Sequence, residues 1–170
     1  MTDLIAKYSG FLIITGVFLL GWLANSLTAD MGQINTESPL SNGLFVPKDV
    51  ESPSNHIERS QIHVYNDKIV LDIPNARWAE FTNTNSMDPI LDIEANSIEI
   101  TPKTSREVKV GDIIAYQPAN FDGLVVHRVV EIGTDSEGWY SIAKGDNLTK
   151  ADPDKIRFSQ IKGVLVGIVY

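Results

Sequence analysis

Asp112-Ile-Ile-Ala-Tyr116 and Leu124-Val-Val-His-Arg-Val-Val-Glu-Ile132 are the stretches that decide the fold. Each has the length of a β-strand, is rich in β-branched residues and is bounded by residues that favour turns. The turn-forming stretch Ala119-Asn-Phe-Asp-Gly123 separates them. They therefore predict two antiparallel strands joined by a turn.

Six further runs share this pattern, and none has a helical face of ten residues or more. They are Ile62-His-Val-Tyr65 and the stretches 68–73, 77–81, 97–101, 139–142 and 163–169. A two-residue hairpin is predicted at Tyr65-Asn-Asp-Lys68 and a longer one at Thr134-Asp-Ser-Glu-Gly138. We expect a mainly β domain with consecutive antiparallel pairing, as a small barrel or as two packed coiled sheets. One turn after Ser86 is the single helical feature expected beyond the N-terminus.

Composition sets the outer limits on this domain. The chain has 170 residues, 43% hydrophobic, with no cysteine and a formal net charge of -8. These values exclude a disordered, collagen-like or disulfide-stapled chain. The acidic balance also argues against nucleic acid as a partner, because binding to phosphate draws on clustered Lys and Arg.

The N-terminus carries a hydrophobic segment. Residues 8–29 contain no charged side chain, and about 20 apolar residues are needed to span a bilayer. Lys7 precedes this segment and Asp30 follows it, which predicts a single-pass protein of the cell membrane with its N-terminus in the cytoplasm. We expect a cytoplasmic tip and anchor at 1–29, a linker at 30–56 and an extracytoplasmic domain at 57–170. A cleaved signal peptide ending near Ala24-Asn-Ser26 is the alternative, and both readings export the domain.

Three polar segments stand out within the domain: Thr84-Asn-Ser86-Met-Asp-Pro89, Val125-Val-His127-Arg, and Lys144-Gly-Asp146-Asn followed by Asp152-Pro153. Taken singly, each is more often a turn or a core histidine than a catalytic element. Together they supply a serine hydroxyl, a base that can take its proton and an acid that can orient the base. This combination predicts a serine hydrolase.

The three segments, in this order and behind a membrane anchor, resemble type I signal peptidase in its archaeal and endoplasmic-reticulum branch. The stretch Gly111-Asp-Ile-Ile-Ala-Tyr116 is also similar to that family, and the resemblance runs from about residue 84 to the C-terminus. The branch assignment rests on His127, since the eubacterial relatives carry lysine there. Imidazole ordinarily titrates near pH 6.5, so it can accept a proton near neutrality. The resemblance implies a signal-peptidase-like β domain behind one transmembrane helix, in the endoplasmic-reticulum membrane if the source is eukaryotic.

The resemblance also implies the roles of the catalytic residues. Ser86 is the nucleophile, His127 the general base and Asp152 the acid of the triad. Asp146 is a second acid that orders the loop or His127, and it is ranked below Asp152 as the histidine's partner. Lys144 could pair with either acid, or it could be a solvated strand end.

Residues around the nucleophile complete the expected site. The backbone N–H of Ser86 and the hydroxyl of Thr84 are the candidates for an oxyanion hole, although family members commonly carry Ser or Gly at the position of Thr84. Met87 and Pro89 are expected to contact substrate. No cofactor is expected, and no metal, because the spacing fits neither a calcium loop nor a zinc site. Arg128 faces away from His127 on its strand, which favours a structural or surface role.

The sequence thus predicts a membrane-anchored serine endopeptidase that removes signal peptides from exported preproteins. Its expected partners are preproteins, membrane lipid and, as a further candidate, the protein-export channel. Two alternatives remain: a processing peptidase dedicated to one surface protein, and an inactive signal-peptidase-like scaffold subunit.

Overall fold

The computed structural model describes residues 17, 19 and 50–170. The chain divides into two units, Met1–Pro47 and Lys48–Tyr170, and the fold given below is that of the second. The anchor predicted at 1–29 and most of the predicted linker lie outside the described residues. Within the part that the structure describes, we find no helix with the length and apolar character of a membrane span.

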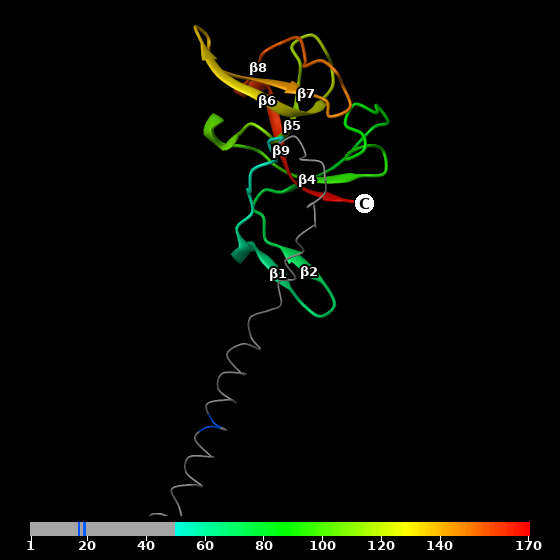
Figure 1. Ribbon diagram of the computed structural model, residues 1–170, viewed down its shortest axis with the longest axis vertical. Helices are drawn as coiled ribbons and strands as arrows, with labels where there is room; N and C mark the ends of the chain where they lie inside the picture. Colours follow the sequence, from blue (N-terminus) through cyan, green and yellow to red (C-terminus); the bar gives the residue numbers. More distant parts are fainter. Residues whose placement is uncertain (1–16, 18, 20–49) are drawn as a thin grey trace, which may run out of the picture. The chain divides into compact units, whose positions relative to one another are not determined.

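A seven-stranded antiparallel sheet forms the body of the second unit, which confirms the prediction of a mainly β chain. Across the sheet the strands are β3 (Arg77–Glu80), β4 (Asn96–Ile100), β9 (Ile161–Val169), β5 (Ile113–Tyr116), β6 (Val125–Asp135), β7 (Gly138–Lys144) and β8 (Ile156–Arg157). The strand register shifts by one residue at three places, where β9 is bulged against β4 and against β5, and β6 is bulged against β7. Bulges bend the strands that carry them. The sheet curls into a half-barrel (Figure 1).

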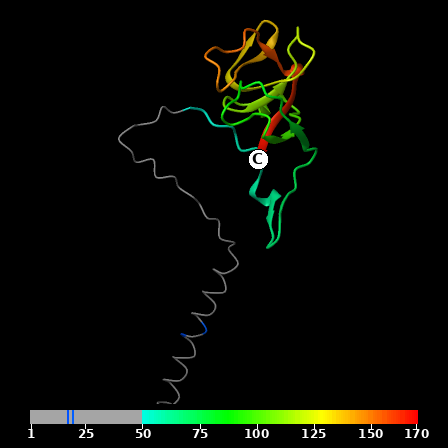
Figure 2. The ribbon, with the colours of Figure 1, turned by 90° about the vertical axis from the view of Figure 1, so that its right-hand side faces the viewer.

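A separate hairpin of β1 (Ile62–Val64) and β2 (Ile69–Leu71) precedes this sheet. Its turn is closed by a hydrogen bond from Tyr65 N to Lys68 O of 2.8 Å, so the predicted two-residue hairpin is confirmed. Every residue of both strands is exposed, and Figures 1 and 2 show the hairpin projecting from the sheet. The remaining elements are short 3₁₀ turns, η1 (Arg59–Gln61), η2 (Ser105–Glu107) and η3 (Phe158–Gln160).

The position of β9 differs from the expected consecutive pairing. Strand β9 lies between β4 and β5. The connection from β4 to β5 therefore skips one position in the sheet, which β9 fills. The apolar residues of β9 do not alternate with polar ones, and Ile161, Val164 and Leu165 are all buried. A strand of this kind needs cover on both faces, and hydrophobic clusters that contain Val164 on one face and Leu165 on the other supply it.

Two hydrophobic clusters cover opposite faces of the central strands. Ile114 and Val164 belong to one cluster, and their chain neighbours Ile113 and Leu165 belong to the other. Because successive side chains of a strand point to opposite faces, the two clusters lie on either side of the sheet. Met87 joins the second cluster with 3% of its surface exposed. The chain around the predicted nucleophile is therefore part of a core.

The strand β8 was missing from the sequence prediction because it has only two residues. Its Arg157 donates to both carboxylate oxygens of Asp135, at 2.9 and 3.1 Å, and to Glu137 at 2.7 Å. Hydrogen bonds from Arg157 and then Lys155 lower the pKa of Asp135.

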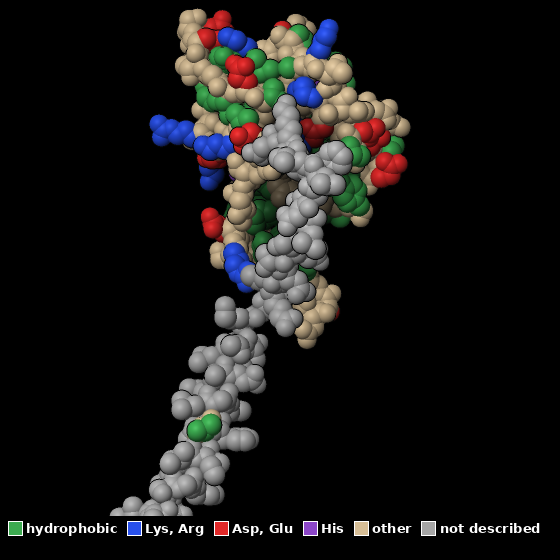
Figure 3. Space-filling view, in the orientation of Figure 1, with side chains coloured by type: hydrophobic (Ala, Val, Ile, Leu, Met, Phe, Trp, Pro, Cys, Tyr) green, Lys and Arg blue, Asp and Glu red, His purple; other side chains and the backbone are tan. Residues whose placement is uncertain are grey.

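The β6–β7 turn itself is shorter than predicted, because Asp135 pairs directly with Gly138. Figure 3 shows basic side chains dispersed among acidic ones on the visible face, as local ion pairs of this kind require.

Leu91, which is 3% exposed in the second cluster, provides a test of this packing. Truncating a buried leucine leaves a cavity, so Leu91→Ala should lower the free energy of unfolding by about 2–5 kcal/mol. Ile93→Ala is the matched control, since Ile93 is 57% exposed and a surface truncation should cost less than about 0.5 kcal/mol. Urea denaturation followed by circular dichroism measures both. Equal losses in the two variants would contradict the assignment of Leu91 to the core.

Candidate active site

Ser86 lies in a tight turn that is fixed by backbone hydrogen bonds of the residues that follow it. The carbonyl of Met87 accepts hydrogen bonds from Ile90 N and Leu91 N, each at 3.1 Å, and Met87 forms a β-bridge with Leu91. The peptide bond between Asp88 and Pro89 is cis. The helical turn expected after Ser86 is thus a hydrogen-bonded turn, held by the burial of Met87 and Leu91.

The loop after β7 holds the other side of this turn. Asn147 N donates to Ser86 O at 3.0 Å, and the Asn147 side chain donates to Asn85 O at 2.9 Å. Asn85 has φ of 56°, a left-handed conformation that asparagine tolerates better than most residues. A β-carbon at Gly145 would lie 2.5 Å from Ser86 O, so only glycine permits this approach. The Lys-Gly-Asp-Asn segment therefore fixes the Ser86 turn through contacts to its backbone.

His127 projects from β6 and is 7% exposed. Its Nδ1 atom lies 2.9 and 2.8 Å from the two carboxylate oxygens of Asp152. An imidazole that donates from Nδ1 to a carboxylate keeps the lone pair of Nε2 free to accept a proton. The geometry therefore gives His127 the tautomer that a general base needs.

Asp152 is itself held by two groups besides His127. Its backbone N–H donates to Ala143 O at 2.8 Å, and the hydroxyl of Tyr116 donates to its Oδ2 at 2.7 Å. Burial raises the pKa of Tyr116 above the ordinary value for tyrosine, and the hydrogen bond and charge of Asp152 act in the same direction. Tyr116 therefore stays protonated and remains a donor to the carboxylate.

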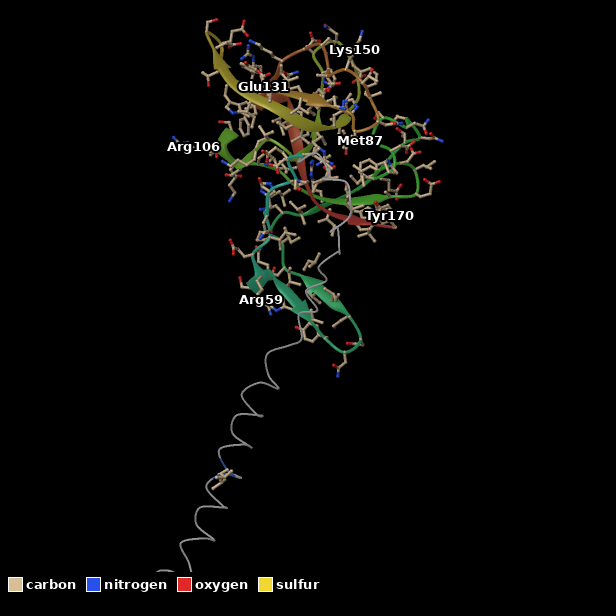
Figure 4. The ribbon with its side chains drawn as sticks, viewed as in Figure 1. Arg59, Met87, Arg106, Glu131, Lys150 and Tyr170 are labelled. Carbon is tan, nitrogen blue, oxygen red and sulfur yellow. The ribbon has the colours of Figure 1, made fainter. Side chains whose placement is uncertain are left out.

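One pocket brings the serine and the histidine together. It has a volume of about 340 Å³ and is lined by Ser86, Thr84, His127 and mainly apolar side chains: Phe81, Thr82, Met87, Leu91, Phe121, Leu124, Val125, Val126 and Leu148. We call it the Ser86 pocket. Met87, which is labelled in Figure 4, lines this pocket together with residues 125–127 of β6.

The remaining predicted residues around Ser86 lie as follows. Thr84 Oγ1 is 3.2 Å from Ser86 Oγ, so the two hydroxyls hydrogen-bond each other. Met87 lines the Ser86 pocket, whereas Pro89 lies in the exposed part of the turn, outside the set of lining residues.

Asp146 contacts Arg128 rather than His127. Arg128 Nε and one terminal nitrogen bind the two oxygens of Asp146 at 2.8 and 2.7 Å, and the other terminal nitrogen donates to Gly111 O at 2.8 Å. Lys144 donates to Gly145 O at 2.9 Å and to Leu148 O at 2.6 Å, so it binds the loop backbone in place of either predicted acid. The sequence favoured a structural or surface role for Arg128 but did not identify its partner. The available signal was its alternation with His127, which indicates the face of β6 but not the partner.

The buried acid Asp112 was also not identified from the sequence. Its side chain is fully buried and accepts hydrogen bonds from Ser54 N at 2.7 Å, Lys109 N at 2.8 Å and His56 Nε2 at 3.1 Å. Residues 54–56, from the end of the predicted linker, are therefore attached beside Gly111. Arg128 donates a hydrogen bond to the carbonyl of Gly111, so the attached residues lie next to the Arg128–Asp146 pair.

Neither a metal site among the described residues nor a comparison with known proteins identifies the function of the Ser86 pocket. Among the residues that the structure describes, no three His, Asp or Glu side chains are grouped so that they could hold a metal ion. No protein-family model matches the chain, and neither a curated protein nor a solved structure does. The chemistry of the site must therefore be argued from the residues themselves.

The Arg128–Asp146 pair should be coupled energetically. Both side chains are mostly buried, with 16% and 21% of their surface exposed, and the contact is bidentate. In a double-mutant cycle of Arg128→Gln and Asp146→Asn, we expect a coupling of about 1–2 kcal/mol in the free energy of unfolding. Lys150→Gln, an exposed change in the same loop, is the control and should show no coupling with Asp146→Asn. Additive effects of Arg128→Gln and Asp146→Asn would contradict the pairing.

Proposed function

We propose that this chain is a serine endopeptidase that cleaves signal peptides from exported preproteins, with Ser86, His127 and Asp152 as its catalytic residues. The observation that carries the proposal is the hydrogen bond from His127 Nδ1 to Asp152, in a histidine that shares a pocket with Ser86. An oriented imidazole beside a serine hydroxyl is the arrangement that activates a serine nucleophile. The resemblance of the three segments to signal peptidase supplies the substrate class.

In the proposed acylation, Ser86 Oγ attacks the carbonyl carbon of the scissile bond while its proton passes to His127 Nε2. The Ser86 hydroxyl hydrogen-bonds Thr84 and must turn toward the imidazole, and such contacts often tighten only with substrate bound. The Asp152 carboxylate stabilises the imidazolium that forms. Next, the C–N bond breaks, and His127 gives its proton to the leaving amine.

Hydrolysis of the acyl-enzyme repeats these steps with water as the nucleophile. His127 takes a proton from water as it attacks the ester carbon, then returns that proton to Ser86 Oγ as the C–O bond breaks. In both tetrahedral intermediates the backbone N–H of Ser86 and the Thr84 hydroxyl would donate to the oxyanion. Hydrogen-bond donors placed in advance at this position contribute a large share of catalysis.

The site also suits an extended substrate. Residues 125–127 of β6 pair with β5 on one edge, whereas pairing with β7 begins only at Arg128. The other edge of 125–127 is next to the Ser86 pocket, so a peptide could add there as a strand. The apolar lining of the pocket matches the small apolar side chains that the signal-peptidase resemblance implies before the cut.

Placement at a membrane completes the proposal. The half-barrel would be the catalytic domain of a signal-peptidase-like protein, held at the outer face of the cell membrane by an anchor at 1–29 with its N-terminus in the cytoplasm. Anchoring would raise the local concentration of enzyme and preprotein on one surface. Membrane lipid would then be a constant partner, and the protein-export channel a neighbour.

Cleavage of a preprotein by the purified chain in detergent tests the function. Ser86→Ala and His127→Ala should each lower the turnover number by at least about 10³-fold, and Asp152→Asn by about 10²–10⁴-fold, because the three groups act as a unit. Ser136→Ala and His63→Ala are matched controls in exposed positions and should retain activity. Unchanged cleavage by Ser86→Ala would contradict the proposal. Failure of the wild type on every standard preprotein would favour a dedicated substrate or a scaffold role.

Thr84 offers a separate test of the oxyanion hole. Thr84→Val removes the hydroxyl at nearly constant size and should lower kcat by about 10²–10³-fold with little change in KM. Thr84→Ser keeps the hydroxyl and should stay near wild type, while Thr104→Val controls for the chemical change at an exposed site. If Thr84→Val and Thr84→Ser have equal kcat, the hydroxyl is not a donor to the transition state.

A further inference from the structure

A second pocket of about 350 Å³ adjoins the Ser86 pocket and shares Phe121, Val125 and His127 with it. Ser86 lines the first pocket, and Asp152 and Asp154 line the second. His127 therefore stands between the two. We call the second one the Asp154 pocket.

A third hollow, of about 430 Å³, continues the Ser86 pocket in another direction. It runs along β3 past Trp78 and shares Phe81, Thr82, Leu124 and Val126 with the Ser86 pocket. These shared residues differ from those shared with the Asp154 pocket. The Ser86 pocket is thus the middle of three connected hollows, with the β3 hollow and the Asp154 pocket as its two extensions.

The direction of a bound polypeptide follows from the proposed chemistry. The acyl half stays attached to Ser86, while the nitrogen that leaves must receive its proton from His127 Nε2. The chain after the scissile bond therefore continues past the imidazole. Of the two extensions, the Asp154 pocket is lined by His127 and the β3 hollow is not. The β3 hollow is left for residues before the cut.

The lining of the Asp154 pocket indicates what it would accept. Its walls include Pro118, Phe121 and Ile156, and a lysine, Lys155, also contributes. Lys155 Nζ lies 2.6 Å from Asp135 and 4.1 Å from the centre of the Tyr140 ring, so its charge is already paired.

Of the two carboxylates, Asp152 binds His127 and Tyr116. Asp154 is exposed and lies close enough to Tyr116 for its charge to help raise the pKa of that phenol. Asp154 therefore supplies the charge that a ligand in the pocket would meet.

We infer that the Asp154 pocket binds the first two residues after the scissile bond and prefers a side chain with an apolar stem and a positive end, Lys or Arg, over Glu or Asp. This inference rests on the proposed function for its choice of ligand. Asp154 acts on selectivity alone, since it touches none of the reacting atoms.

Binding of short peptides tests the pocket without any turnover. The probes are two N-acetylated tetrapeptides with a fluorescent C-terminal label, Ala-Lys-Ala-Ala and Ala-Glu-Ala-Ala, measured by fluorescence polarisation with the full chain in detergent. The Lys peptide should bind about three- to fivefold more tightly than the Glu peptide, as expected for one partly exposed charge pair. Asp154→Asn should abolish this difference, and Asp154→Lys should reverse it. Asp67→Asn, in the exposed β1–β2 turn, is the control and should leave it unchanged.

A filling substitution tests the location. Ala119→Phe places a ring in the wall of the Asp154 pocket and should weaken both peptides, whereas Ala151→Phe, exposed and outside the lining, should weaken neither. The inference is overturned if Asp154→Asn keeps the wild-type preference or if Ala119→Phe binds both peptides normally. Peptide selectivity is measured without cleavage, so unchanged cleavage by Ser86→Ala would refute the proposed function while the peptide data still decide the fate of the pocket.

Discussion

The bidentate contact of Arg128 with Asp146 is the interaction on which the rest of the site depends. Arg128 belongs to β6, the strand that carries His127, and Asp146 belongs to the loop whose Asn147 holds the backbone of Ser86. One ion pair therefore joins the element with the predicted base to the loop that positions the predicted nucleophile. The third nitrogen of the guanidinium binds Gly111 O, which ties the same pair to the start of β5. A planar guanidinium with several fixed donors suits such a junction, and a lysine ammonium could not replace it.

Hydrophobic packing on both faces of the sheet stabilises the strands and the turn that this ion pair joins. The central strands bury apolar side chains on both faces, and the Ser86 turn uses one of these faces through Met87. The rigidity of the turn thus comes from a hydrophobic core, while its exact placement comes from hydrogen bonds to the loop after β7. The proposed function and the stability of the fold depend on the same turn, so variants of the turn should be assessed for folding before activity is interpreted.

Much of the fold could be predicted from local sequence, because β-branched runs bounded by turn residues mark strands one at a time. The place of β9 between β4 and β5 could not, since pairing across the chain depends on which faces remain to be buried. The site divides in a similar way. Ser86 and His127 could be proposed from their chemistry, and Asp152 from the resemblance to signal peptidase. Arg128 and Asp112, in contrast, act through partners that only the register of the sheet and the path of residues 54–56 bring close.

The hydroxyl of Tyr116 on Asp152 has a consequence for the energetics of charge formation. Asp152 Oδ2 lies 2.7 Å from the hydroxyl oxygen of Tyr116 and 2.8 Å from His127 Nδ1. Hydrogen bonds to these two groups hold the carboxylate in one orientation. In the proposed reaction, a positive charge appears on the imidazole within one step. The carboxylate that meets this charge is already oriented toward the imidazole, so little reorganisation energy is spent at that moment. Tyr116 would thus lower the barrier by fixing the carboxylate, without touching the reacting atoms.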